Sequence, residues 1–200
     1  WKINSKSKWI KSYLILASIS LCFLALLKTI EKFFFFGMFL EHMIQFSTPL
    51  IVYFFLFKTR LFVKYKMILK VIMACTFIGH GLFAIGYYPV PGHFIDMIVN
   101  VFGTNEGFAR QLLKVAGALD ILASILLFVP SLTRSMLCFM TLWGGATALA
   151  RLIAHVDFNL ISFTGNQWVW EALVRVPHAL IPCFALYLFP KYKKDIKKPA

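Results

Sequence analysis

The chain has 200 residues, of which 60% are hydrophobic and 14% are charged, and its formal net charge is +13. Soluble domains are typically about 45–50% apolar and about 25% charged, so this composition excludes an ordinary soluble domain and predicts an all-α, polytopic transmembrane bundle. The basic residues flank apolar runs, as membrane topology and anionic lipids favour, and we expect no nucleic-acid partner. We expect one membrane domain with three parts: an N-terminal helical pair (1–66), a four-helix core (67–190) and a basic tail (191–200).

Hydropathy predicts about six spans, because a helix needs about 20 predominantly apolar residues to cross a bilayer. The predicted spans are Tyr13–Ile30, Phe33–Phe57, Met67–Tyr87, Leu112–Val129, Leu132–His155 and Trp168–Phe189. The lysines before the first span resemble the start of a signal peptide. No small-residue cleavage site follows the apolar run, so we expect this helix to be retained.

Lysine and arginine are concentrated in alternate connecting segments, which predicts the orientation. The rich segments hold Lys2, Lys6, Lys8, Lys11, Lys58, Arg60, Lys64, Lys66, Arg134, Lys191, Lys193, Lys194, Lys197 and Lys198. The opposite side holds only Lys28, Lys32, Arg110 and Lys114. By the positive-inside rule we expect both termini in the cytoplasm and a multi-pass protein of the plasma (inner) membrane.

The connection 89–111 is expected on the outer side and contains a short amphipathic helix. Apolar residues recur at helical spacing from Phe94 to Phe102, and Asp96 lies on the opposite face. Such a helix lies in the membrane interface or folds over the mouth of the bundle. The connection 156–167 is expected on the same side.

Small residues and prolines indicate where helices pack closely or bend. The turn Val129-Pro130-Ser131 predicts antiparallel packing of the two spans that it joins. Gly144, Gly145 and Gly117 allow neighbouring backbones to approach closely. Prolines inside a span free backbone carbonyls and kink the helix. The prolines in question are Pro49, Pro177 and Pro182.

The last span carries Glu171, Arg175 and His178 among apolar residues. A charged side chain at the centre of a membrane helix costs about 2.5–3.5 kcal/mol, and such groups usually face a bundle interior or a wet cavity. Glu171 and Arg175 are spaced i, i+4, so they can pair on one helix face. We therefore expect other helices to supply polar groups at matching depth.

Helical rise places ionisable residues of several spans in the outer half of the membrane, whereas the inner half has almost none. This candidate ligand-binding layer consists of Glu41, His42, His80, Asp120, Arg151, Glu171, Arg175 and His178. One reading is a polar pocket reachable from the outer side or the outer leaflet. The alternative is a set of ion pairs, such as Glu171–Arg175 and Asp120–Arg151, that only fixes the helix register.

The cysteines do not indicate a redox or thiolate metal centre. Cys22, Cys75, Cys138 and Cys183 lie singly on different predicted spans, and no C-x-x-C motif occurs. We expect them to be small packing residues and expect no metal site.

The segment from the third to the sixth span resembles the DoxX-like superfamily of small membrane proteins. The resemblance rests on FIGHGLFAIGYYPVPG and on the run from LLKVAGALD to WGGATALARL, with His80-Gly81 and Gly117…Asp120 in the family's positions. It covers about residues 67–190, and the first two spans are an addition to it. The resemblance implies a four-helix core and an association with quinone-linked redox systems.

An apolar pocket with convergent histidine, arginine and carboxylate groups suits a quinone head. The expected contacts are His80, His178, Arg175 and Asp120. We expect an accessory subunit, with the lipid bilayer and other membrane subunits as partners, and leave catalytic residues unassigned. Alternatives are a purely structural subunit, a proton-coupled transporter or channel, and less favoured, a b-haem or metal protein.

Overall fold

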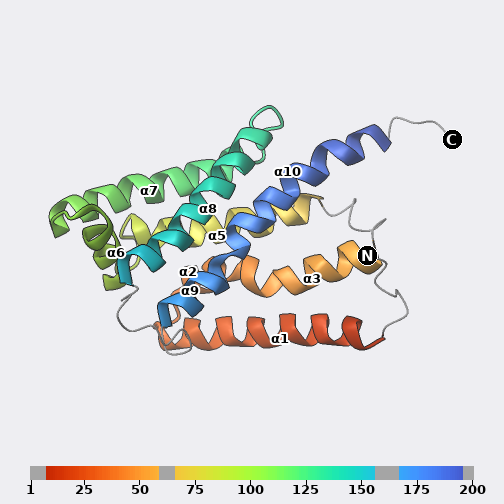
Figure 1. Cartoon of the computed structure of the whole chain (residues 1–200), viewed down its shortest axis with the longest axis horizontal. Helices are drawn as coiled ribbons and strands as arrows, with labels where there is room; N and C mark the ends of the chain where they lie inside the picture. The colour runs from red at the N-terminus through yellow and green to blue at the C-terminus, as the bar shows by residue number, and fades with distance from the viewer. Residues whose placement is uncertain (1–7, 59–65, 156–166, 196–200) are drawn as a thin grey trace.

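The computed structural model describes residues 8–58, 66–155 and 167–195, with side chains up to Phe189. These residues form an all-α bundle, which confirms the predicted fold class (Figure 1). The helices are α1 (Lys8–Glu31), α2 (Phe36–Glu41), α3 (Met43–Phe57), α5 (Lys66–Ala84), α6 (Gly92–Phe102), α7 (Glu106–Leu126), α8 (Thr133–His155), α9 (Gln167–Arg175) and α10 (Pro177–Asp195). The connection predicted at 156–167 lies outside the described residues except for its last residue. The end of the basic tail from residue 196 on also lies outside the described residues, as do Lys2, Lys6, Arg60 and Lys64, which were used to predict the orientation.

Five stretches of the described chain are long and apolar enough to cross a membrane, which makes this an integral membrane protein. They are Lys8–Glu31, Phe36–Phe57, Lys66–Ala84, Thr133–His155 and Gln167–Phe189. The remaining predicted span is α7, whose 21 residues match a hydrocarbon core about 30 Å thick. It falls outside the apolar set because it carries Glu106, Arg110, Lys114 and Asp120.

The long helices run alternately up and down the bundle (Figure 1). The α7–α8 turn, the start of α1 and the ends of α3 and α10 lie at one end, here called the turn end. At the other end α7 and α8 splay apart, and α6 lies between them; we call this the α6 end. The tight turn at 129–131 therefore joins antiparallel helices, as predicted.

The amphipathic helix predicted in the 89–111 connection is α6. Its buried residues Phe94, Ile95 and Ile98 pack against Phe83, Leu113 and their neighbours. Gly103, at a left-handed φ of 62°, ends the helix, as glycine commonly does at a helix C-terminus. The α6 end is thus closed by a packed helix.

The start of the fourth predicted span is six residues earlier than expected, and this corrects the prediction. Helix α7 begins at Glu106 rather than Leu112. Asn105 caps it by accepting a hydrogen bond from the backbone N–H of Phe108, and Glu106 pairs with Arg110 one turn on. The cap and the ion pair extend the helix through polar residues that hydropathy assigns to a loop.

Two spans are broken, and both breaks lie at the level of the ionisable residues. The last span breaks between α9 and α10 at Val176, just before Pro177, which agrees with the predicted kink. The second span breaks at His42, between α2 and α3, although Pro49 lies inside α3 without interrupting it. The kink predicted at Pro49 therefore does not extend to a break of the helix at that residue.

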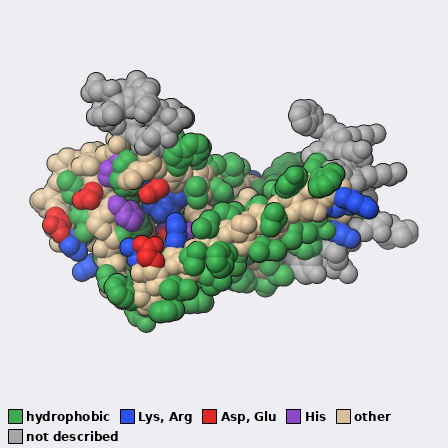
Figure 2. All heavy atoms as spheres, turned by 90° about the horizontal axis from the view of Figure 1, so that it is seen from below, with side chains coloured by type: hydrophobic (Ala, Val, Ile, Leu, Met, Phe, Trp, Pro, Cys, Tyr) green, Lys and Arg blue, Asp and Glu red, His purple; other side chains and the backbone are tan. Residues whose placement is uncertain are grey.

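The half of the bundle toward the turn end is filled by aliphatic side chains. Ile44, Met73, Leu127, Met140 and Leu188 belong to one cluster, and each is at most 2% exposed. Figure 2 shows the complementary arrangement on one face: acidic, basic and histidine side chains gather at the α6 end, with hydrophobic side chains along the middle of the bundle. The uneven distribution of polar groups predicted from the sequence is thus a property of the fold.

Candidate functional site

The two helix breaks bring Glu41 and His42 close to His178. At each break a histidine ring forms a hydrogen bond with a backbone carbonyl that the helix leaves free. His42 Nδ1 lies 2.8 Å from Met38 O, and His178 Nδ1 lies 3.0 Å from Arg175 O. A carbonyl only accepts, so both rings donate from Nδ1. These hydrogen bonds satisfy backbone carbonyls at the helix breaks, at a depth in the membrane where water is not present to do so.

A continuous series of side-chain contacts runs from α1 to α10. Lys28 Nζ lies 3.3 Å from His42 Nε2, and His42 Nδ1 lies 3.7 Å from Glu41 Oε1. Glu41 Oε2 lies 3.6 Å from His80 Nδ1, and His80 Nε2 lies 3.1 Å from His178 Nε2. We call these five residues the histidine network. It links four separate helical segments across the α6 end.

Two glycines permit this geometry by bringing backbones into contact. A Cβ at Gly79, one residue before His80, would stand 2.5 Å from the Glu41 amide nitrogen. A Cβ at Gly144 would stand 2.6 Å from the His178 carbonyl oxygen. Real Cβ atoms do not approach that closely, so α5 reaches Glu41, and α8 reaches His178, only because these residues are glycine. The sequence predicts close packing at Gly144, and the structure gives its partner.

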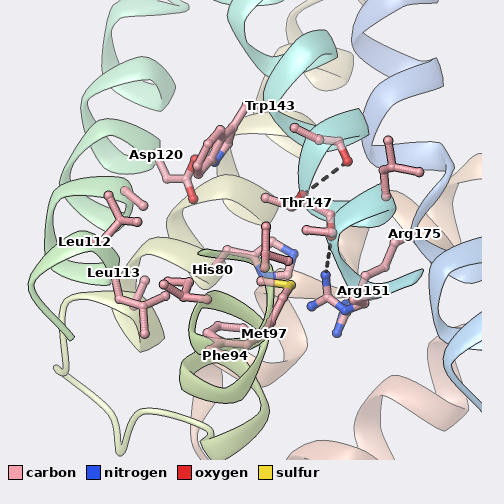
Figure 3. Close-up of a pocket in the computed structure, with 18 of the residues that line it drawn as sticks. His80, Phe94, Met97, Leu112, Leu113, Asp120, Trp143, Thr147, Arg151 and Arg175 are labelled. Atoms are coloured by element: carbon pink, nitrogen blue, oxygen red, sulfur yellow. Dashed lines mark hydrogen bonds between the residues drawn. The ribbon is translucent and has the colours of Figure 1, made fainter. Parts of the chain in front are cut away.

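A cavity of about 450 Å³ lies beside the network, between α5, α6, α7 and α8 (Figure 3). Its walls are mainly apolar, with Phe77, Phe94, Leu112 and Met97 among them. Five ionisable residues also line it, and all were predicted site residues: His80, Asp120, Arg151, Arg175 and His178.

Arg151 is the best-buried cation of the cavity, only 4% exposed. One guanidinium nitrogen donates to the Thr147 carbonyl at 3.0 Å, and the guanidinium carbon lies 5.9 Å from the centre of the Phe94 ring. Its Nε lies 3.9 Å from a Glu171 oxygen but has no hydrogen-bond acceptor. Arg175 also has a buried Nε without an acceptor. Both guanidinium groups lie side by side in Figure 3.

Asp120 lies on the opposite wall, on α7. It is 6% exposed, and the Trp143 side chain hydrogen-bonds its carboxyl group. Its Oδ1 atom has no partner. A buried carboxyl oxygen without a donor is costly, so this atom is a natural contact for a ligand hydroxyl.

The predicted site residues therefore fall into three groups. The five named above line the cavity, Glu41 and His42 stand behind His80 in the histidine network, and Glu171 lies at the rim with its side chain 44% exposed. Neither example of a structural ion pair appears among the described residues. Glu171 instead pairs with Arg151 of α8, and Asp120 bonds Trp143 of the same helix.

Sequence reasoning missed two participants. Lys28 was assigned only to a connecting segment, but the last turn of α1 brings it to His42. Trp143 was not among the predicted site residues, although it lines the cavity next to Gly144. No local feature of the sequence identifies the partner of Lys28.

His93 stands in α6, outside the spans, and is electrostatically coupled to the cavity. Burial, together with the positive charges of Arg151 and Arg175, lowers the pKa of His93 from its ordinary value of 6.5 to about 4. The ring is therefore neutral at physiological pH. The closing helix thus adds no further positive charge beside the two arginines.

Metal binding gains no support from the geometry. No group of three or more His, Cys, Asp or Glu side chains converges on one point within the ranges 8–58, 66–155 and 167–189. The Nε2 atoms of His80 and His178 contact each other directly, so they do not offer free nitrogens to an iron placed between them.

Comparisons of the chain with protein-family models, with curated proteins and with solved structures found no match.

Proposed function

We propose that this integral membrane protein binds a quinone, or a similar lipid-soluble molecule with an oxygen-bearing head, in the cavity at the α6 end. The observation that supports it most is that this cavity of about 450 Å³ combines apolar walls with five ionisable side chains. Small-molecule sites are typically about 300–1,000 Å³, mainly apolar, with a few placed polar groups.

The polar groups match the chemistry of a quinone head. Carbonyl oxygens accept hydrogen bonds, and Arg151 and Arg175 each have a buried N–H without an acceptor. Asp120 Oδ1 lacks a donor on the opposite wall, so it suits the hydroxyl of a quinol. The head therefore finds complementary partners in both its oxidised and its reduced form.

The apolar tail of such a ligand has a route to lipid. Phe102, Leu149 and Ile153 line the cavity and are 64%, 55% and 60% exposed. The cavity is thus bounded by side chains at the outer surface of α6 and α8. A lipid-soluble molecule enters there from the bilayer without crossing water.

Residues 67–190 form the part that we propose to be DoxX-like, acting as an accessory subunit of a redox-linked system. Both His80 and Asp120, which carry the resemblance, line the cavity. A Cβ at Gly81 would lie 2.8 Å from the Gly117 carbonyl oxygen, so the two other motif residues are in backbone contact. With both termini cytoplasmic in the plasma membrane, the α6 end faces outward.

A proton-coupled transporter is a second candidate, because broken helices at mid-membrane are typical of transporter binding sites. The histidine network would then serve as the proton relay. The aliphatic cluster toward the turn end weighs against it. Met73, Leu127 and Met140 belong to it and are fully buried.

Equilibrium binding of a short-chain ubiquinone to the purified protein tests the proposal. Ala150 lines the cavity, and Ala150→Phe should fill it and lower the affinity at least tenfold. Ala118→Phe, at an exposed position of α7 outside the cavity, is the matched control and should bind as the wild type does. Equal affinity in both variants, or no binding by the wild type, contradicts the proposal.

A further inference from the structure

Hydrogen-bond accounting in the histidine network locates one exchangeable proton. His178 donates from Nδ1 to the Arg175 carbonyl, 3.0 Å away, so a neutral His178 has a bare Nε2. The 3.1 Å contact between the two Nε2 atoms holds one hydrogen, and it must then belong to His80. A neutral His80 consequently presents a bare Nδ1 to Glu41.

That arrangement leaves an ionised Glu41 without a hydrogen-bond donor. Glu41 is 5% exposed, and its Oε2 atom faces the His80 Nδ1 atom at 3.6 Å. Its other oxygen faces His42 Nδ1 at 3.7 Å, but that nitrogen already donates to Met38 O. A buried carboxylate opposite a lone pair, without a donor, is strongly disfavoured. One additional proton, held between Glu41 and His80, supplies the missing hydrogen bond.

We propose that Glu41 and His80 hold one exchangeable proton in common and pass it through His178 to a ligand head in the cavity. This deepens the proposed function, because the ligand arm rests on a quinone-type head. Glu41 is the proton store, His80 the carrier, and His178 the group that presents the proton. His80 and His178 both line the cavity, whereas Glu41 stands one contact behind them.

The transfer balances without any outside reactant. The proton on His80 Nε2 moves to His178 Nε2, and His80 Nδ1 takes or keeps the proton shared with Glu41. The products are an ionised Glu41, a neutral His80 protonated at Nδ1, and a doubly protonated His178. His178 then carries the transferred hydrogen on Nε2, and its ring lines the cavity in which the ligand head would accept it.

The surrounding charges set when the transfer occurs. Arg175 and Arg151 line the cavity together with His178, Lys28 contacts His42, and Asp120 lies on the opposite wall. The Arg175 carbonyl accepts from His178 Nδ1. Without a ligand, an added positive charge on His178 would stand among the two arginines with no acceptor in the cavity, so we expect the proton on the Glu41–His80 pair. A ligand oxygen that accepts from Arg175 and His178 offsets the repulsion and draws the proton forward.

Nitrogen NMR of histidine-labelled protein in lipid nanodiscs tests this, because it distinguishes the protonation state of each ring nitrogen. Without ligand we expect His42 and His178 protonated at Nδ1 only. For His80 we expect either both nitrogens protonated, or Nε2 protonated beside a carboxylic acid signal of Glu41 in the infrared spectrum. A neutral His80 beside an ionised Glu41 overturns the proposal, whether or not any ligand binds.

Adding a short-chain ubiquinone tests the transfer itself. We expect the His178 Nε2 atom to become protonated in the wild type and to stay bare in Glu41→Gln, which has no proton to give. Glu106→Gln, at the exposed pair with Arg110, should behave as the wild type does. An unchanged His178 in a wild-type protein that binds ubiquinone, or equal protonation in Glu41→Gln, contradicts the transfer. Should Glu41→Gln fail to fold, the wild-type spectra decide alone.

Discussion

Gly144 of α8 lies against the backbone carbonyl of His178, so closely that a Cβ at position 144 would stand 2.6 Å from that oxygen. The contact fixes the distance between α8 and the break in the last span. It therefore sets where the His178 ring stands relative to Arg151, which lies seven positions beyond Gly144 on the same helix.

Gly144→Ala should lower thermal stability in detergent by an amount typical of overpacking, about 1–3 kcal/mol. It should also displace His178 and weaken ubiquinone binding. Gly145→Ala is the matched control, because its Cβ would meet only the Ala179 Cβ at 3.7 Å, an ordinary contact. Helix propensity should make that variant neutral or slightly more stable. If both variants melt alike, the close approach of α8 to His178 is refuted.

Gly79→Ala should move α5 away from Glu41, since the added Cβ would stand 2.5 Å from the Glu41 amide nitrogen. We expect a loss of stability of about 1–3 kcal/mol and a changed nitrogen NMR signal for His80. Gly92→Ala, which meets nothing within 4 Å, is the control. An unchanged His80 signal in a folded Gly79→Ala protein would show that the network does not depend on this contact.

Asn105→Ala should loosen the first turn of α7, because the Asn105 side chain accepts from the Phe108 amide. Loss of such a cap typically costs about 1 kcal/mol. Limited trypsin digestion after Arg110 should therefore accelerate relative to wild type. Gln111→Ala, an exposed change on the same helix, should leave the cleavage rate unaltered. Equal rates in all three proteins would mean that α7 does not begin at Glu106.

The pH dependence of stability should contain a contribution from His93, whose pKa falls from 6.5 to about 4 on folding. Because the folded-state pKa lies below the unfolded one, the neutral ring contributes fully above pH 6.5 and the contribution is lost as pH falls toward 4. Melting temperatures in detergent should therefore decline less steeply over this range in His93→Gln. Parallel curves for the two proteins would exclude a buried, neutral His93.

The sequence predicted the bundle, the tight turn and the polar layer because these follow from hydropathy and local turn chemistry. The break before Pro177 was predictable for the same reason: proline cannot continue the preceding hydrogen bonds. The break at His42 was not, because no proline causes it. It depends on the Met38 carbonyl meeting the His42 ring and on Thr76 Oγ1 accepting from the Ile44 amide at 3.0 Å.

The partners within the polar layer were less predictable than its members. Spacing along one helix suggested Glu171 with Arg175, but the Arg151 side chain, from another helix, reaches Glu171 instead. The approach of Glu41 to His80 depends on Gly79, and this dependence exists only once α2 and α5 are packed. Tertiary distances of a few ångströms decide such pairs, and a single sequence does not carry them.

Photolabelling with an azido-substituted ubiquinone in lipid nanodiscs tests most directly whether the cavity at the α6 end is a ligand site. Labelled peptides should map to its walls, near Met97 of α6 and Ala150 of α8. Unlabelled ubiquinone and the Ala150→Phe substitution should each abolish this labelling. Labelling confined to the lipid-facing surface of α1, or unaffected by both treatments, would contradict a quinone site in the cavity.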